Sequence, residues 1–152
     1  MKLDKMNVDT LIIYAESLGI DVTEFHFEAL DAMSLDDGSI AYDPRKFRTA
    51  RRLISALIHE IGHVQTGTYY NYQAPRWLRE KAEDTADRMA LQMFLPKEEL
   101  ERAIRNGATE VWQLLQVFPV TPRLMKKALW LYFDIEIPTH KKSARLSGTS
   151  LA

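Results

Sequence analysis

The stretch ISALIHEIGHVQTGTYY, residues 54 to 70, contains His59 and His63, two of the four histidines of the chain. Histidines at i and i+4 lie one turn apart on the same face of an α-helix. On a helical wheel Glu60 falls about 100° from His59, and apolar residues fill a wide arc on the other side. The pattern predicts a largely buried helix whose two imidazoles share a narrow polar slot. Gly62 weakens this helix, which indicates close approach by a neighbouring backbone.

The segments around this helix predict a mostly helical α+β fold. The apolar pattern and the Gly and Pro positions predict a helix over 46–66, ended by Gly67, and a second long helix over 75–95, ended by Pro96. Shorter elements are a helix over 7–18, strands within 22–27 and 36–43, and helices over 97–106, 109–118 and 122–133. We therefore expect a small N-terminal β-sheet packed on a zincin-like core of two helices, followed by C-terminal helices. Residues 1–138 are expected to form one domain, and residues 139–152 a disordered tail.

The composition limits the class of protein. The chain has 152 residues, 46% of them hydrophobic, with a net charge of -1, as expected for one globular domain without a general affinity for nucleic acid or anionic membranes. It has no cysteine, which excludes cysteine catalysis and thiolate metal ligands. No apolar run approaches the roughly 20 residues of a membrane span, and the N-terminus does not have the pattern of a signal peptide. We expect a cytoplasmic protein.

The motif H-E-x-x-H on a helix is typical of zinc metallopeptidases. His59 and His63 would bind Zn²⁺, and Glu60 would act as the general base on the attacking water. The alternative is a chance match, which has a probability on the order of one in a hundred in a chain with so few histidines. Two histidines do not complete a zinc site, so a third ligand must come from elsewhere in the chain.

The second long helix offers that ligand. Its expected buried face consists of Ala82, Ala86, Met89, Ala90 and Met93. Glu83 borders this face, whereas Glu80 points to solvent, so Glu83 is the expected third ligand. Asp87, one turn further, is placed to accept the second N–H of a ligand histidine. The alternative is that Glu83, Asp84 and Asp87 are ordinary solvated charges paired with Lys81 or Arg88, with His26 and His140 as competing metal ligands.

Two further segments allow two interpretations each. Tyr69 and Tyr70 follow the histidine helix closely, where a phenol can stabilise an oxyanion or contact substrate, although aromatic packing is the simpler explanation. Residues 110–133 resemble a helix-turn-helix, but their only basic residues are Arg123, Lys126 and Lys127. That number is too small for a convincing phosphate-binding face, so these helices are expected to be core with a substrate-docking edge.

HEIGHVQTG, residues 59–67, followed by EDTADRMALQMFLPKEEL, residues 83–100, resembles the ImmA/IrrE family of zinc metallopeptidases of phages and mobile elements. The resemblance implies zinc bound by His59, His63 and Glu83, with Glu60 as general base. It also implies an anti-repressor role, in which a helix-turn-helix repressor is cleaved or antagonised. Met89 departs from an aromatic position of the family, and the similarity fades after Pro96, where substrate recognition is left open.

The sequence thus predicts a zinc-dependent endopeptidase with one Zn²⁺ per chain, acting on a partner protein, most simply a helix-turn-helix transcriptional repressor. Neither direct nucleic-acid binding nor a membrane partner is expected. The alternative is a metal-retaining binding module that sequesters a repressor or senses stress without turnover. A DNA-binding regulator that uses residues 110–133 is a third possibility, which the near-neutral charge disfavours.

Overall fold

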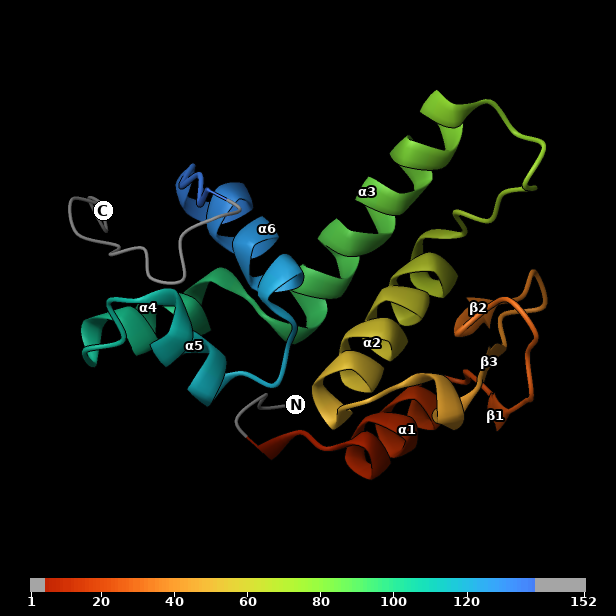
Figure 1. The fold of residues 1–152 in the computed structure, drawn as a ribbon, viewed down its shortest axis with the longest axis horizontal. Helices are drawn as coiled ribbons and strands as arrows, with labels where there is room; N and C mark the ends of the chain where they lie inside the picture. The colour runs from red at the N-terminus through yellow and green to blue at the C-terminus, as the bar shows by residue number, and fades with distance from the viewer. Residues whose placement is uncertain (1–4, 139–152) are drawn as a thin grey trace.

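The computed structural model describes residues 5–138, and within that range the fold is α+β and mostly helical, as the sequence predicts (Figure 1). The expected tail, residues 139–152, lies outside the described residues. In chain order the elements are α1 (Val8–Ser17), β1 (Val22–Glu24), β2 (Ala32–Ser34), β3 (Ile40–Tyr42), a 3₁₀ turn η2 (Pro44–Lys46), α2 (Ala50–Thr66), α3 (Arg76–Phe94), α4 (Lys97–Arg105), α5 (Val111–Val117) and α6 (Pro122–Phe133). Among the described helices, none is both long enough and apolar enough to cross a membrane.

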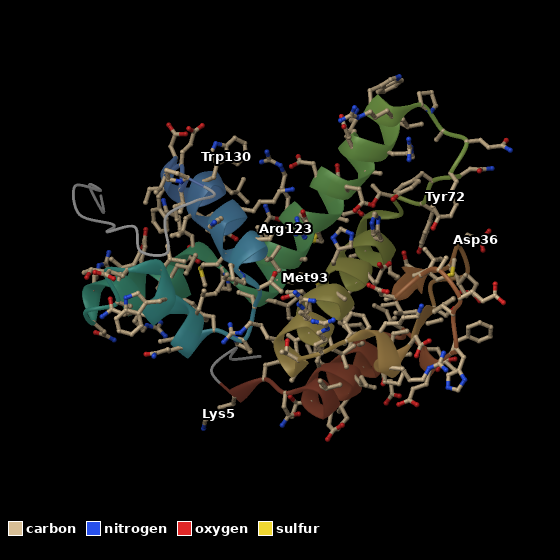
Figure 2. The ribbon with its side chains drawn as sticks, in the orientation of Figure 1. Lys5, Asp36, Tyr72, Met93, Arg123 and Trp130 are labelled. Atoms are coloured by element: carbon tan, nitrogen blue, oxygen red, sulfur yellow. The ribbon has the colours of Figure 1, made fainter. Side chains whose placement is uncertain are left out.

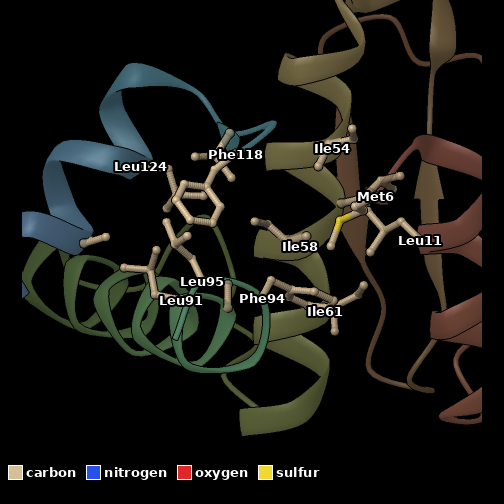
Figure 3. Close-up of a cluster of buried hydrophobic side chains, with 14 of the residues drawn as sticks. Met6, Leu11, Ile54, Ile58, Ile61, Leu91, Phe94, Leu95, Phe118 and Leu124 are labelled. Atoms are coloured by element: carbon tan, nitrogen blue, oxygen red, sulfur yellow. The ribbon is translucent and has the colours of Figure 1, made fainter. Parts of the chain in front are cut away.

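Helix α2 is the centre of the arrangement. It contacts α1 and strands β2 and β3 on one side and α3 on the other (Figure 1). Helices α4, α5 and α6 gather around the C-terminal end of α3, away from the sheet. Figure 3 shows Ile54, Ile58 and Ile61 of α2 between the N-terminal and C-terminal halves of the hydrophobic core. The histidine helix therefore joins the two halves, which explains its wide apolar arc.

The sheet has the strand order β1-β3-β2, in which β3 pairs parallel with β1 and antiparallel with β2. Strand β1 ends at Glu24, earlier than the expected segment to residue 27, and β2 was not expected at all. Ala32, Met33 and Ser34 include no β-branched or aromatic residue, so this segment lacks the strand-forming composition of β1 and β3. Strand β2 is an edge strand and lies against α2, so it borders the face on which the histidines project.

Helix α2 begins at Ala50, four residues later than the expected start at Lys46. Thr49 is its N-cap, and the Thr49 hydroxyl accepts a hydrogen bond from the backbone N–H of Arg52 at 3.2 Å. The preceding residues instead form η2, whose first turn is capped by the buried carboxylate of Asp43. The helix ends at Gly67, with φ 63°, as expected.

Helices α2 and α3 approach most closely at Gly62. A Cβ atom added there would overlap the carbonyl oxygen of Ala86 and lie 2.9 Å from its carbonyl carbon. The expectation that a neighbouring backbone approaches Gly62 is therefore confirmed. This contact fixes the distance between the two helices one residue from His63 and one residue from Asp87, and thereby positions both halves of the candidate site.

We expect Gly62→Ala to lower the free energy of unfolding by about 1–3 kcal/mol, the usual range for overpacking. Alanine favours the helix by about 1 kcal/mol, but the overlapping atoms belong to backbone and cannot move aside as a side chain can. Urea unfolding followed by circular dichroism measures the change. Gln65→Ala, at an exposed position of the same helix, is the control and should leave stability within about 0.5 kcal/mol. A Gly62→Ala protein as stable as the parent would contradict the close approach.

The start of α6 is tied to the start of α2 by polar contacts. The guanidinium of Arg51 donates to the carbonyl oxygens of Leu115, Phe118 and Val120 at 2.5–2.8 Å. The Ser55 hydroxyl accepts a hydrogen bond from the backbone N–H of Thr121 at 2.8 Å. These bonds satisfy carbonyls at the end of α5 and hold α6 beside the histidine helix.

Candidate metal centre

His59, His63 and Glu83 come together between α2 and α3 and form the His-His-Glu cluster. The Nε2 atom of His59 lies 3.0 Å from Glu83 Oε2, the Nε2 atom of His63 lies 3.1 Å from Glu83 Oε1, and the two Nε2 atoms are 3.1 Å apart. A tetrahedral zinc with bonds of about 2.0–2.1 Å has ligand atoms about 3.3 Å apart. One ligand atom from each of the three residues lies within 4.8 Å of the other two, so these residues can hold a metal ion.

Both histidines are turned so that Nε2 faces the centre of the cluster. The Nδ1–H of His59 donates to Asp87 Oδ1 at 2.7 Å, and the Nδ1–H of His63 donates to the carbonyl oxygen of Thr68 at 2.8 Å. Such outer hydrogen bonds fix the tautomer and the ring orientation of metal-binding histidines. The structure thus places Asp87 where the sequence analysis expected it, and adds Thr68, which the sequence analysis did not consider.

Asp87 also connects the cluster to α6. Its Oδ2 atom lies 2.8 Å from Lys127 Nζ and 3.2 Å from Arg123 Nη1, and Figure 2 shows Arg123 on α6 beside α3. Ala82, Ala86 and Ala90 on the expected face of α3 are buried, as predicted. Met89 and Met93 are only half-buried, and Asp87, Leu91 and Phe94 are buried instead. The C-terminal helices pack on α3 and shift its buried side toward Asp87. In the sequence, Arg123 and Lys127 are spaced i and i+4, which places both cations on the same face of α6 and could have indicated an acidic partner.

The electrostatics of the cluster favour a cation. Burial by itself lowers the pKa of His59, but hydrogen bonds to Asp87 and Glu83 outweigh it and raise the pKa to about 9. Hydrogen bonds from His59 and His63 hold the pKa of Glu83 well below its usual range. Burial raises the pKa of Asp87, but its bonds to His59, Arg123 and Lys127 more than reverse this and hold the pKa far below normal. Two ionised carboxylates therefore flank the imidazoles.

The cluster is open to solvent at Glu83. The side chains of His63 and Asp87 are only 6% and 3% exposed, whereas that of Glu83 is 41% exposed. Glu60 borders two surface pockets, one shared with His63 and Glu83 and the other with His59. A molecule on this face can therefore reach both the ligand atoms and the Glu60 carboxylate.

Of the two tyrosines, only Tyr70 makes a hydrogen bond to the cluster. The phenol of Tyr70 donates to Glu83 Oε1 at 2.6 Å, and burial together with this bond raises its pKa to about 12. Tyr69 lines the same pocket as Tyr70 and Glu60 but has no hydrogen bond to the ligand residues. At neutral pH Tyr70 is a hydrogen-bond donor beside the open face.

The competing ligands do not join the cluster. Within residues 5–138, the His-His-Glu cluster is the one group of three or more potential metal-binding side chains close enough to share an ion. Glu80 pairs with Arg76 in an exposed ion pair, and His26 lies in the exposed loop after β1. His140 lies outside the described residues. Comparison of the chain with protein-family models, curated proteins and solved structures finds no match.

We expect Asp87→Ala to weaken metal binding by about 10–100-fold, the usual effect of removing an outer partner of a metal-binding histidine. The substitution removes the acceptor for His59 Nδ1, leaves Arg123 without its carboxylate partner and leaves Lys127 paired with Asp84 alone. Competition with a chromophoric chelator measures the affinity. Asp84→Ala, which removes the neighbouring carboxylate bound to Lys127 and Arg88, is the matched control and should change the affinity less than threefold. Equal affinities in the two variants would contradict an orienting role for Asp87.

Proposed function

We propose that the chain is a zinc-dependent endopeptidase that hydrolyses a peptide bond in a partner protein. The observation that carries this proposal is the position of Glu60, whose carboxylate makes no hydrogen bond within residues 5–138 and borders the open face of the His-His-Glu cluster. Two imidazoles and one carboxylate are a donor set of catalytic zinc sites, whereas Mg²⁺ and Ca²⁺ prefer ligands that are all oxygen. A purely structural metal would not require Glu60 there.

The residues around the cluster have separate roles in this proposal. Zinc, when bound, supplies Lewis acidity that polarises the scissile carbonyl and acidifies water. The carboxylate of Glu60 takes the proton from the attacking water and passes it to the nitrogen of the leaving amine. Asp87 and Thr68 hold the imidazoles in place. The phenol of Tyr70 stays protonated at neutral pH and would exchange its hydrogen bond to Glu83 for one to the developing oxyanion.

The free edge of β2 supports a peptide as the substrate. The backbone pairs Asp31–Asp43 and Leu35–Ser39 are hydrogen-bonded, at 2.8 Å each. Because hydrogen bonding alternates along an antiparallel ladder, the backbone N–H and C=O groups of Ala32 and Ser34 point away from β3. An extended peptide can therefore add to this edge and lie across the pocket that contains Glu60 and His63.

The partner protein is proposed from the resemblance to ImmA/IrrE peptidases. A helix-turn-helix repressor encoded beside this chain is the first substrate to test, with mass spectrometry used to locate the cut. Zinc-loaded protein should cleave it, 1,10-phenanthroline should stop the reaction, and added Zn²⁺ should restore it. Relief of repression without any cleavage would favour the alternative, a binding module that sequesters the repressor.

A further inference from the structure

Two pockets of different chemistry meet at Glu60, one on each side. The aromatic pocket, about 140 Å³, is lined by Met33, Tyr69, Tyr70 and Tyr72, with His63 and Glu83 at its floor. Tyr72 extends from the α2–α3 connection toward the sheet side of the molecule (Figure 2). The lining of this pocket contains no lysine or arginine.

The basic pocket, about 490 Å³, lies on the other side and is lined by Lys46, Arg52 and Arg123, next to His59. The side chain of Arg52 makes no ion pair and no hydrogen bond with any residue between 5 and 138. Lys46 Nζ donates to the carbonyl oxygen of Glu28 at 2.8 Å and to no carboxylate. Arg123 contacts Asp87, yet its side chain is 67% exposed. The acidic residues of the lining are Asp31 and Glu60.

Isolated surface cations are usually just solvated, so exposure alone would carry no conclusion. Here three cations from three elements line one cavity, and that cavity adjoins the proposed general base. Cations gathered in one concave site attract anions more strongly than the same charges spread over a surface. The absence of any cation from the aromatic pocket makes the two sides of Glu60 electrostatically different.

The free edge of β2 connects the two pockets, because Ala32 and Glu60 line both of them. A strand added at that edge advances about 3.3 Å per residue, so residues a few positions apart in one peptide reach both pockets. Such a peptide places one group of side chains among the tyrosines and the other among the cations.

We propose that the chain selects substrate segments with an acidic side chain within about three residues of the scissile bond, on one side only, and an apolar or aromatic side chain on the other. This rests on the proposed endopeptidase function and specifies its substrate class. Arg52 is the specificity residue that is simplest to test, since it carries no other interaction. Replacement by Glu leaves the helix start intact, because Thr49 and a Glu at residue 52 form a capping box.

The test uses the zinc-loaded full chain and a diverse peptide library, with cleavage positions located by mass spectrometry. One cleaved peptide is then made with Glu, Gln or Lys at the preferred acidic position. We expect kcat/KM to fall about tenfold from Glu to Lys, and this preference to shrink in 0.5 M NaCl. Arg52→Glu should reverse the order of the Glu and Lys peptides. Arg48→Glu, which makes the same charge change just before α2 and outside both pockets, should keep the original order.

The negative results of this test distinguish the specificity proposal from the endopeptidase proposal. Cleavage of the library without an acidic preference, or an unchanged preference in Arg52→Glu, would overturn the specificity proposal and leave the endopeptidase proposal standing. If zinc-loaded protein cleaves no peptide and no partner protein, both proposals fall together.

Discussion

Glu60→Gln is expected to lower kcat/KM for peptide hydrolysis by about 10²–10⁴-fold while the protein stays folded and binds zinc normally. Glutamine has nearly the same size as glutamate but cannot take a proton from the attacking water. The Glu60 carboxylate makes no hydrogen bond within residues 5–138 and lies on the pocket side of α2, so its replacement removes no hydrogen bond between the helices. The assay compares initial cleavage rates of the two zinc-loaded proteins at equal metal content.

The matched control is Gln65→Glu, which converts an amide to a carboxylate at an exposed position of α2, the reverse of the change in Glu60→Gln. It should leave the cleavage rate within twofold of the parent. A Glu60→Gln protein that relieves repression as well as the parent would exclude the catalytic role of Glu60. In that case the metal-retaining binding module would be the correct interpretation.

Glu83→Ala is expected to weaken zinc binding by more than the 10–100-fold typical of outer partners, because it removes one of three ligands. Glu83 supplies oxygens 3.0 Å from His59 Nε2 and 3.1 Å from His63 Nε2, and two imidazoles alone do not complete a catalytic zinc site. The side chain is 41% exposed, so its truncation leaves no cavity in the core. Metal analysis and chelator competition measure the loss, and circular dichroism checks the fold.

Glu80→Ala is the control for this substitution. Glu80 is one turn before Glu83 on the same helix and forms an exposed ion pair with Arg76, so its removal should leave the zinc content unchanged. If Glu83→Ala kept full zinc and Glu80→Ala lost it, the third ligand would be misassigned. The distances between Glu83 and the two imidazoles predict the opposite result.

The sequence was sufficient to predict the parts of the fold that long periodic patterns define. The ends of α2 and α3 follow from Gly67 and Pro96, and the small sheet with its α+β class was expected. Strand β2 was missed because Ala32, Met33 and Ser34 include no β-branched or aromatic residue that would indicate a strand. The start of α2 was misplaced because η2, capped by Asp43, takes up the residues before Thr49.

The candidate site also has a part that the sequence predicts and a part that it does not. His59, His63 and Glu83 were chosen from local helical spacing, and the structure brings the three side chains together. The partners of Asp87 were missed because Arg123 and Lys127 come from α6, 36 and 40 residues further along the chain. Contacts of that kind depend on how α6 docks, which Arg51 and Ser55 determine through polar bonds that no periodic pattern reveals.

The most direct test of the central claim is the metal content of the purified full-length protein, measured by mass spectrometry beside His59→Ala. The His-His-Glu cluster predicts about one zinc per chain in the parent protein and almost none in the variant, with both proteins folded. A folded parent protein that contains no zinc and takes up none when Zn²⁺ is supplied would contradict the account.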